Sequence, residues 1–276
     1  MSGAVPRHGD RVPASLLTQS FRRLALALAC ASLAHAIVAA QTLTVAAASD
    51  LQFALPAIAA QFEKDTGQKA TLTFGSSGNF FTQIQNGAPF DLFLSADVDY
   101  PKRLERAGLA DTGSLYEYAT GRIVLWTRHD SGIDLSGGLS VLTNPSVRRV
   151  AIANPEHAPY GRAAIAALRH EQLYERVRSK FVLGENISQA AQFVQSGNAE
   201  VGVLALSLAL APLLSASGTY VAIPESFHPP IEQAAVVLAV SRQKAVARQF
   251  IDFLKRPGSV RLLQSYGFAP PRAAPR

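Results

Sequence analysis

The chain has very little cysteine, and this limits its chemistry. Among 276 residues there is one cysteine, Cys30, with one methionine and one tryptophan. A single cysteine forms no internal disulfide and cannot build a thiolate metal site. Charged residues are also sparse at 17%, while 48% of the residues are hydrophobic. This composition is typical of a globular protein with a substantial core, and the length allows two domains.

Residues 1–40 resemble an export signal rather than part of the fold. Arg22 and Arg23 precede the apolar, alanine-rich run "LALALACASLAHAIVAA", which ends at Ala40. We predict a signal peptide over 1–40, cleaved after Ala40 or after Ala36. A membrane anchor is the alternative, but the run is short for a span. A lipoprotein signal is a further alternative, disfavoured because Ala27 stands where a bulky aliphatic residue belongs.

A concentrated basic surface is missing from the sequence. The formal net charge is +6, from 26 basic and 20 acidic residues, and without residues 1–40 it falls to +3. The remaining basic residues are scattered, with no basic stripe interleaved with aromatic residues. The sequence therefore predicts no nucleic-acid partner.

Catalytic and metal-binding patterns are absent as well. The stretch "GSSGN" resembles a nucleophile elbow around Ser77, but position 79 holds Asn where that motif needs Gly. No GxxxxGK[ST] phosphate loop occurs. Four histidines follow residue 40, without the spacing of metal ligands: His129, His157, His170 and His228. We therefore expect neither an enzyme nor a metal bound directly by side chains, and no cofactor.

What the sequence does contain is a regular alternation of strand-like and helix-like segments. Amphipathic helical periods occur at 51–65, 161–178, 187–196 and 241–264. The strand-like runs are "LTVAAAS", "ATLTFG", "DLFLSA", "RIVLWT", "RVAIANP", "KFVLGEN", "VGVLALS", "YVAIPE" and "AAVVLAV". The alternation predicts an α/β fold with mainly parallel sheets flanked by helices. Nine strands in about 235 residues favour two modest sheets over one.

Two segments are predicted to connect these sheets. They are residues 112–122, "TGSLYEYATGR", and the proline-rich 225–233, "ESFHPPIEQ". A chain that leaves one lobe at the first segment and returns at the second gives a discontinuous lobe 1, residues 41–120 and 231–276. Lobe 2 is then residues 121–230, inserted between its two parts.

Four strand-to-helix junctions share one chemistry. Ser49 follows "TVAAA", Ser76–Asn79 follow "TLTF", Pro159–Gly161 follow "AIANPEHA", and Asn186–Ser188 follow "FVLGE". Each offers unpaired N–H groups at the positive end of a helix, and none carries Lys or Arg. Taken alone, each junction is more simply a helix cap or a turn. Together, at the ligand-binding ends of α/β strands, they predict an anion site built from neutral donors.

Five motifs in order, spanning about residues 42–268, resemble the periplasmic molybdate-binding proteins of ABC transporters. They are "LTVAAASDL", "TFGSSGNFFTQIQNGAPFDLFLSAD", "IANPEHAPYG", "SGNAEVGVLALSLA" and "FLKRPGSVRLLQSYGF". The resemblance implies a two-lobed type II periplasmic binding protein that closes by a hinge. It holds molybdate or tungstate in the interlobe cleft, only as the oxyanion, and delivers it to a membrane permease and its ATPase. Periplasmic localisation and a monomer are also implied.

The resemblance also assigns ligand contacts by motif position. Ser49 and Ser77 would donate from hydroxyl and backbone N–H, and Tyr160 and Ile187 from backbone N–H. The small residues before Ser49 would then let the backbone approach the oxyanion, while Ser49 also caps the helix that follows.

One contact of the family is missing here. Some members add a tyrosine hydroxyl where this chain has Ala205. Asn79, Ser188 or the Tyr160 hydroxyl are the possible substitutes, and the sequence does not choose among them.

Two rival functions keep the same fold. The effector domain of a transcription regulator would need a DNA-binding helix pair and no export signal, the reverse of what is seen. A receptor for sulfate, phosphate or an organic anion is harder to separate, because the fold does not fix the ligand. We expect sulfate to bind more weakly because of its size. Hydrogen phosphate should bind poorly, because Asp50, the one nearby acceptor, is expected to face solvent.

Overall fold

The computed structural model describes residues 1, 3, 4 and 42–272. The predicted signal segment, with its cleavage positions and Cys30, lies outside the described residues, residues 1, 3 and 4 excepted. The chain divides into two units, 1–41 and 42–276, and every described helix and strand belongs to the second. None of the helices that the structure describes has the length and apolar character needed to cross a membrane.

Ten strands form two five-stranded sheets within residues 42–272. The first sheet has the order β2-β1-β3-β10-β4, and the second β7-β6-β8-β5-β9. The strands of the first are β1 (Leu43–Ala48), β2 (Ala70–Gly75), β3 (Leu92–Ser95), β4 (Tyr116–Gly121) and β10 (Ile231–Val237). Those of the second are β5 (Ile123–Arg128), β6 (Val150–Ala153), β7 (Phe181–Gly184), β8 (Val201–Ala205) and β9 (Gly218–Ala222).

The predicted α/β architecture with mainly parallel sheets is confirmed. In the first sheet β1 pairs in parallel with β2 and β3, and β10 is the one strand that runs against its neighbours. In the second, β5 is the one antiparallel strand beside parallel β6, β7 and β8. Each sheet therefore takes its reversed strand from a segment at a crossing between the sheets.

The first predicted crossing is a strand over most of its length. Residues 116–121 form β4, and only Arg122 separates β4 from β5 in the other sheet. The second passage runs from the end of β9 to Ile231, the first residue of β10, through a short 3-10 turn, η5 (Glu225–Phe227). The division into lobes at 120/121 and 230/231 stays a prediction, and the two sheets support it.

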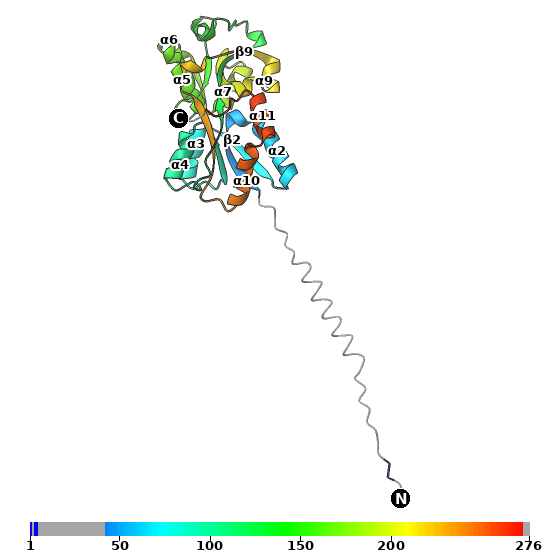
Figure 1. Ribbon diagram of the computed structural model, residues 1–276. Helices are drawn as coiled ribbons and strands as arrows, with labels where there is room; N and C mark the ends of the chain where they lie inside the picture. Colours follow the sequence, from blue (N-terminus) through cyan, green and yellow to red (C-terminus); the bar gives the residue numbers. More distant parts are fainter. Residues whose placement is uncertain (2, 5–41, 273–276) are drawn as a thin grey trace. The chain divides into compact units, whose positions relative to one another are not determined.

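The larger helices flank the sheets (Figure 1). They are α2 (Ala54–Thr66), α3 (Ser77–Gln85), α4 (Asp99–Arg106), α5 (Pro159–His170), α7 (Ile187–Gln195), α10 (Lys244–Leu254) and α11 (Pro257–Ser265). Shorter helices are α6 (Tyr174–Val177), α8 (Leu206–Ala209) and α9 (Pro212–Ser217), with 3-10 turns η1 (Ser49–Leu51), η2 (His129–Ser131), η3 (Gly138–Thr143) and η4 (Arg178–Lys180).

Two predicted helices are divided in the structure. The period at 241–264 becomes α10 and α11, because Pro257 begins a new helix at a position where its missing N–H costs nothing. The period at 161–178 becomes α5 and α6, separated at Gln172, the one described non-glycine residue with a positive φ, 57°. Helix boundaries follow these breaks rather than the apolar period.

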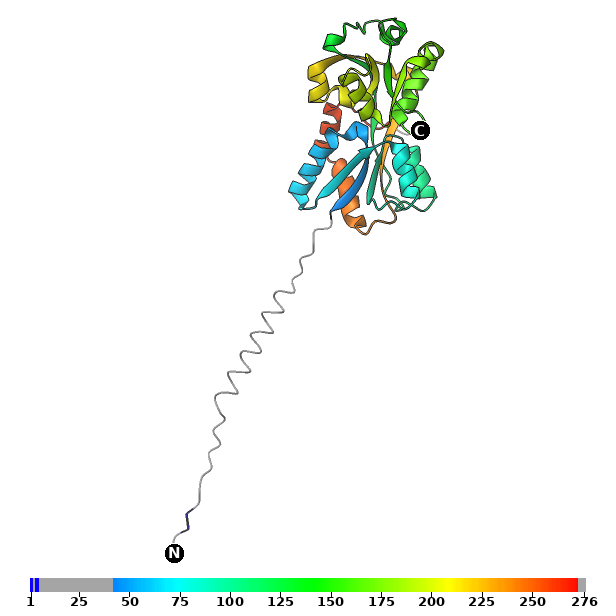
Figure 2. The ribbon, with the colours of Figure 1, turned by 180° about the vertical axis from the view of Figure 1, so that it is seen from behind.

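Residues distant in the sequence build the core of the first sheet. Phe62 of α2 packs edge-to-face on Phe250 of α10 at 5.0 Å between ring centres. Figures 1 and 2 show α10 and α11, orange to red, beside α2. On the opposite face, Phe93 of β3 packs with Phe80 of α3. The core beside the second sheet includes the fully buried Trp126 of β5.

Candidate functional site

A small buried cavity collects the four predicted junctions. Its lining comes from the C-terminal ends of strands and the first turns of helices in both sheets. The lining residues are Ala48, Ser49, Asp50, Gly75, Ser76, Ser77, Ala96, Ala158, Pro159, Tyr160, Asn186 and Ile187. The cavity volume is about 10 Å³, close to the space of one water-sized sphere. Ser49, Ser77, Tyr160 and Ile187 are thus brought together in one place.

Ser77 begins α3, and its hydroxyl is held in a defined direction. Its Oγ accepts the Ala96 N–H at 2.9 Å, in a buried hydrogen bond. A hydroxyl whose oxygen already accepts one bond keeps its own hydrogen for donation. Ser77 is 1% exposed, so this donor sits in a site from which water is largely excluded.

Ser49 differs from the expectation in one respect. It opens the 3-10 turn η1 and makes no side-chain cap, while α2 begins only at Ala54 behind Phe53. The prediction that Ser49 caps the following helix is therefore wrong. Its hydroxyl makes no hydrogen bond to any described residue, and its carbonyl accepts the Ser188 hydroxyl at 2.9 Å.

The first turns of α5 and α7 supply backbone donors. Pro159 and Tyr160 are the first two residues of α5, and Ile187 is the first of α7. The Asn186 side chain caps α7 by accepting from the N–H groups of Ser188 and Gln189. This leaves the Ile187 N–H outside the cap. The N-terminus of a helix of this length carries a partial positive charge that favours anions.

The three suggested substitutes for the missing tyrosine hydroxyl each have another partner. Asn79 donates to Glu185 across the cleft. Ser188 donates to Ser49 O, and the Tyr160 hydroxyl donates to Asp50 Oδ2 at 2.8 Å. Ala205 lies fully buried at the end of β8. None of Asn79, Ser188 and Ala205 is among the residues that line the cavity.

Asp50 is the residue that sequence reasoning placed wrongly. It is 1% exposed and lines the cavity, rather than facing solvent. Its Oδ2 accepts from the Tyr160 hydroxyl and from Gln233 Nε2 at 2.6 Å. Its Oδ1 is buried with no hydrogen-bond partner. Gln233 in turn accepts from the Tyr118 hydroxyl at 2.8 Å, so the polar network joins four buried side chains.

Burial shifts the titration of this network. It raises the pKa of Asp50 from 3.8 to about 6, although the hydrogen bonds from Gln233 and Tyr160 act in the opposite direction. Burial, and then the nearby charge of Asp50, also raise the pKa of Tyr118 and of Tyr160 well above 10.0. Both phenols therefore remain neutral donors at ordinary pH. In the sequence, the position of Asp50 next to Ser49 was the one indication that Asp50 belongs to the site. Nothing in the sequence indicated Gln233 or Tyr118.

Direct contacts join the two sides of the cavity. Ser76 Oγ and the Gly78 N–H both donate to the carbonyl of His157, at 2.5 and 2.9 Å. The ring Nδ1 of His157 lies 2.9 Å from Ser76 Oγ. The two sides of the cavity are thus in contact, with the first turn of α3 against the segment before α5.

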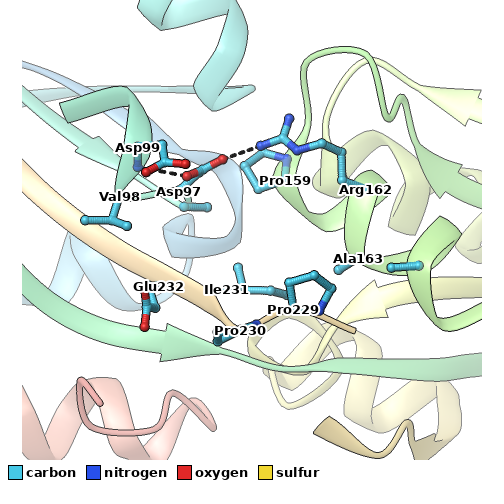
Figure 3. A pocket seen from close by; sticks show the side chains of 12 residues that line it. Asp97, Val98, Asp99, Pro159, Arg162, Ala163, Pro229, Pro230, Ile231 and Glu232 are labelled. Carbon is cyan, nitrogen blue, oxygen red and sulfur yellow. Dashed lines mark hydrogen bonds and ion pairs between the residues drawn. The ribbon is translucent and has the colours of Figure 1, made fainter. Parts of the chain in front are cut away.

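A second and larger cavity, of about 350 Å³, lies beside the first (Figure 3). It is lined by α5, by the residues after β3 and by Pro229–Glu232. Asp97 and Arg162 form an ion pair across it, as Figure 3 shows. Asp99 and Glu232 add two more carboxylates. The excess of negative charge makes this cavity unsuitable for an anion.

Metal binding by side chains finds no support in the described part of the chain. No group of three or more His, Cys, Asp or Glu residues described by the structure is arranged to hold a metal ion.

The chain is similar to known bacterial solute-binding proteins. The family model for bacterial extracellular solute-binding proteins matches residues 43–269. The molybdate-binding protein ModA of Azotobacter vinelandii is 41% identical over 249 residues, covering 90% of this chain and 98% of that protein. ModA of Rhodobacter capsulatus is 39% identical over 226 residues, covering 81% and 87%. The solved structure of the Azotobacter vinelandii periplasmic molybdate-binding protein aligns with a TM-score of 0.78 and 34% identity, over 83% of this chain and all of that one.

Proposed function

Because the chain belongs to the family of bacterial extracellular solute-binding proteins, we propose that its small buried cavity binds molybdate, and tungstate similarly well. The observation that carries this proposal is the lining of the cavity: serine hydroxyls and the first turns of helices from both sheets, without Lys or Arg. A tetrahedral dianion can accept hydrogen bonds from every such wall. Similarity to a protein named for molybdate binding extends over 98% of that protein's length and supports the proposal.

Four residues make the contacts in this proposal. Ser49 and Ser77 donate from hydroxyl and backbone N–H, and Tyr160 and Ile187 donate from backbone N–H. Their support is that all four line one cavity and that the Ser77 hydroxyl has its oxygen already occupied by Ala96 N–H. Molybdenum is held only through its oxygens, and no cofactor takes part.

The protein then acts as a receptor and not as a catalyst. The site contains hydrogen-bond donors that match a charge already present on the ligand. Ser76 Oγ touches the His157 ring, but its hydrogen is donated to the carbonyl of His157, so the ring does not act on it as a base. We propose that the protein works in the periplasm as a monomer and passes the oxyanion to the permease and ATPase of an ABC importer. Membership of a solute-binding family supports this role.

Selectivity among oxyanions rests on size and on protons. The cavity of about 10 Å³ has to widen to hold any of these anions. We expect its occupied width to suit the longer metal–oxygen bonds of molybdate, so that the hydrogen bonds of the smaller sulfate are stretched. The expected refusal of phosphate relied on Asp50 facing solvent, and Asp50 lines the cavity instead. A missing acceptor is therefore no longer a reason to exclude phosphate.

Calorimetric titration of the purified protein with molybdate, tungstate, sulfate and phosphate tests the proposal. We expect molybdate and tungstate to bind with similar affinity and sulfate far more weakly. Equal or tighter binding of sulfate or phosphate would move the assignment to another oxyanion. Absence of heat with all four anions, confirmed by an unchanged melting temperature, would exclude oxyanion binding, because a ligand of the folded state raises its stability.

A further inference from the structure

The buried carboxyl of Asp50 has no part in the donor set proposed above. It lines the cavity beside Ser49 and is 1% exposed. One of its oxygens, Oδ2, accepts from Tyr160 and Gln233, while Oδ1 has no hydrogen-bond partner. An unpartnered buried oxygen is costly, so such a group calls for an explanation in terms of function.

The elements that pack against the turn holding Asp50 supply no positive charge to offset its carboxylate. The turn η1 contacts β2, α7 and α8, and none of these three segments contains a charged or titratable side chain. Tyr160 of α5 and Gln233 of β10 donate to Asp50, and Tyr118 of β4 joins this network through its bond to Gln233.

The charged residues of α5, β4 and β10 are engaged elsewhere or exposed. Arg162 of α5 pairs with Asp97, and His170 with Glu171. Arg169 of α5 lies over the Tyr174 ring. Glu117 of β4 pairs with Lys102, and Glu232 of β10 lines the larger cavity.

A negative Asp50 and a dianion cannot share this small cavity without strong repulsion, because like charges at short range in a buried site disfavour the doubly ionised state. We infer that Asp50 carries a proton when a dianionic oxyanion is bound, so that each binding event takes up one proton and Asp50 determines which protonation state of an oxyanion the cavity accepts. This inference rests on the proposed oxyanion-binding function.

Binding of a dianion beside Asp50 adds one proton to the site. It comes from solvent and forms a bond to a carboxyl oxygen, where Oδ1 is the oxygen without a partner. Phosphate can meet the same condition as the monoanion, dihydrogen phosphate, which brings its own extra proton and donates it in a hydrogen bond to the carboxylate. In both cases the anion and Asp50 together carry a net charge of −2.

The pH dependence of affinity follows from this count. In the empty protein the pKa of Asp50 is about 6, raised by burial. Below that pH the carboxyl is already protonated, and binding takes up little or no proton. Above it, the affinity for a dianion falls roughly tenfold per pH unit, because one proton must be bound with each ligand.

His157 is a further titratable group close to the cavity, and its effect must be separated from that of Asp50. It contacts Ser76 through Nδ1, and its Nε2 lies 3.7 Å from Glu185. Protonation of a histidine would also favour an anion at lower pH. The variant His157→Gln removes this charge while Asp50 remains.

The test is calorimetry of the full-length protein with molybdate at about pH 5 and about pH 8, each in two buffers of different ionisation enthalpy, which reports protons taken up per ligand. The wild type and His157→Gln should take up close to one proton at the higher pH and few at the lower. Asp50→Asn should take up none and bind with an affinity that changes little with pH. Asp252→Asn, at an exposed carboxylate paired with Lys255, is the matched control and should behave as the wild type.

A further variant tests the network itself. Tyr160→Phe removes a hydrogen bond that lowers the pKa of Asp50, so the onset of proton uptake should move to higher pH.

The outcomes separate the two proposals. Tight molybdate binding by the wild type without proton uptake at about pH 8 overturns the role of Asp50 and leaves the proposed function intact. Uptake that persists in Asp50→Asn and disappears in His157→Gln assigns the proton to His157 and also overturns the inference. No molybdate binding at either pH overturns both. If Asp50→Asn does not fold, the wild-type proton count and the Tyr160→Phe shift decide.

Discussion

At the scale of single residues, the two serines of the small cavity have different second roles. The Ser77 hydroxyl accepts the buried Ala96 N–H, so it supports the junction after β3 as well as facing the cavity. The Ser49 hydroxyl bonds to no described residue, and only its carbonyl is engaged, by Ser188. Their loss should therefore affect stability unequally.

We predict that Ser49→Ala and Ser77→Ala each reduce molybdate affinity by about ten- to a hundredfold, since a hydrogen bond to a charged group contributes about 1.5–3 kcal/mol. Only Ser77→Ala should also lower the free energy of unfolding, by about 1–3 kcal/mol, because it leaves the Ala96 N–H without an acceptor. Calorimetry and urea denaturation of the ligand-free protein measure the two effects. Wild-type affinity in both variants would remove these serines from the site.

The buried carboxyl of Asp50 leads to a second prediction at the residue scale, on the pH dependence of the stability of the ligand-free protein. The pKa of Asp50 is raised from 3.8 to about 6 in the folded state. The stability that this carboxyl contributes is fully present below about pH 4 and is lost as the pH rises through about 6. The difference corresponds to about 3 kcal/mol.

Asp50→Asn should accordingly raise the free energy of unfolding at about pH 7.5, by up to about 3 kcal/mol relative to its effect at about pH 4. Denaturation with urea at both pH values measures this, with Asp252→Asn as the exposed control. The same pH dependence of stability in Asp50→Asn and in the wild type would contradict the assignment of a perturbed carboxyl to this position.

At the scale of elements, the first turn of α3 is a contact between the two sides of the cleft. A Cβ at Gly78 would lie 2.6 Å from His157 O and 2.8 Å from the Tyr100 hydroxyl. No side chain fits there while the Gly78 N–H donates to His157 O. The glycine therefore allows α3 to approach the segment before α5 closely.

We predict that Gly78→Ala weakens molybdate binding at least about tenfold, because the added methyl holds the two sides apart, while Ala favours the helix itself by up to about 1 kcal/mol. Gly258 occupies the same second position in α11 with open space around it, so Gly258→Ala is the matched control and should bind normally. Calorimetry and thermal denaturation distinguish the loss of affinity from a loss of folding. Unchanged affinity in Gly78→Ala would show that this approach is not needed for binding.

At the scale of the whole molecule, residues 42–272 contain the family domain, and residues 1–40 are predicted to direct export. N-terminal sequencing of the protein recovered from the periplasm should begin at Gln41 or at Ile37, because the apolar run ends in small residues suited to signal cleavage. Recovery with intact Met1, or with lipid on Cys30, would contradict cleavage at these positions.

The amino-acid sequence alone determined the fold class of this protein and the positions of the four junctions. Apolar periods and turn residues predicted an α/β fold with two sheets, since strands and helices bury one face each and repeat at different periods. The same order identified the junctions at Ser49, Ser77, Tyr160 and Ile187, because helix N-termini after strands are local features. The strand β4 was missed because "YEYATG" carries polar residues and ends in a glycine.

Only the tertiary structure decided what lies opposite each junction. Asp50 reads as an ordinary first-turn carboxylate until residues 110 and 183 positions away, Tyr160 and Gln233, are brought onto it. The donors suggested to replace the missing tyrosine hydroxyl are likewise engaged by partners distant in the sequence, such as Glu185 for Asn79. Burial and hydrogen-bond partners arise when the two sheets meet, so the protonation state of the cavity is a property of the folded chain.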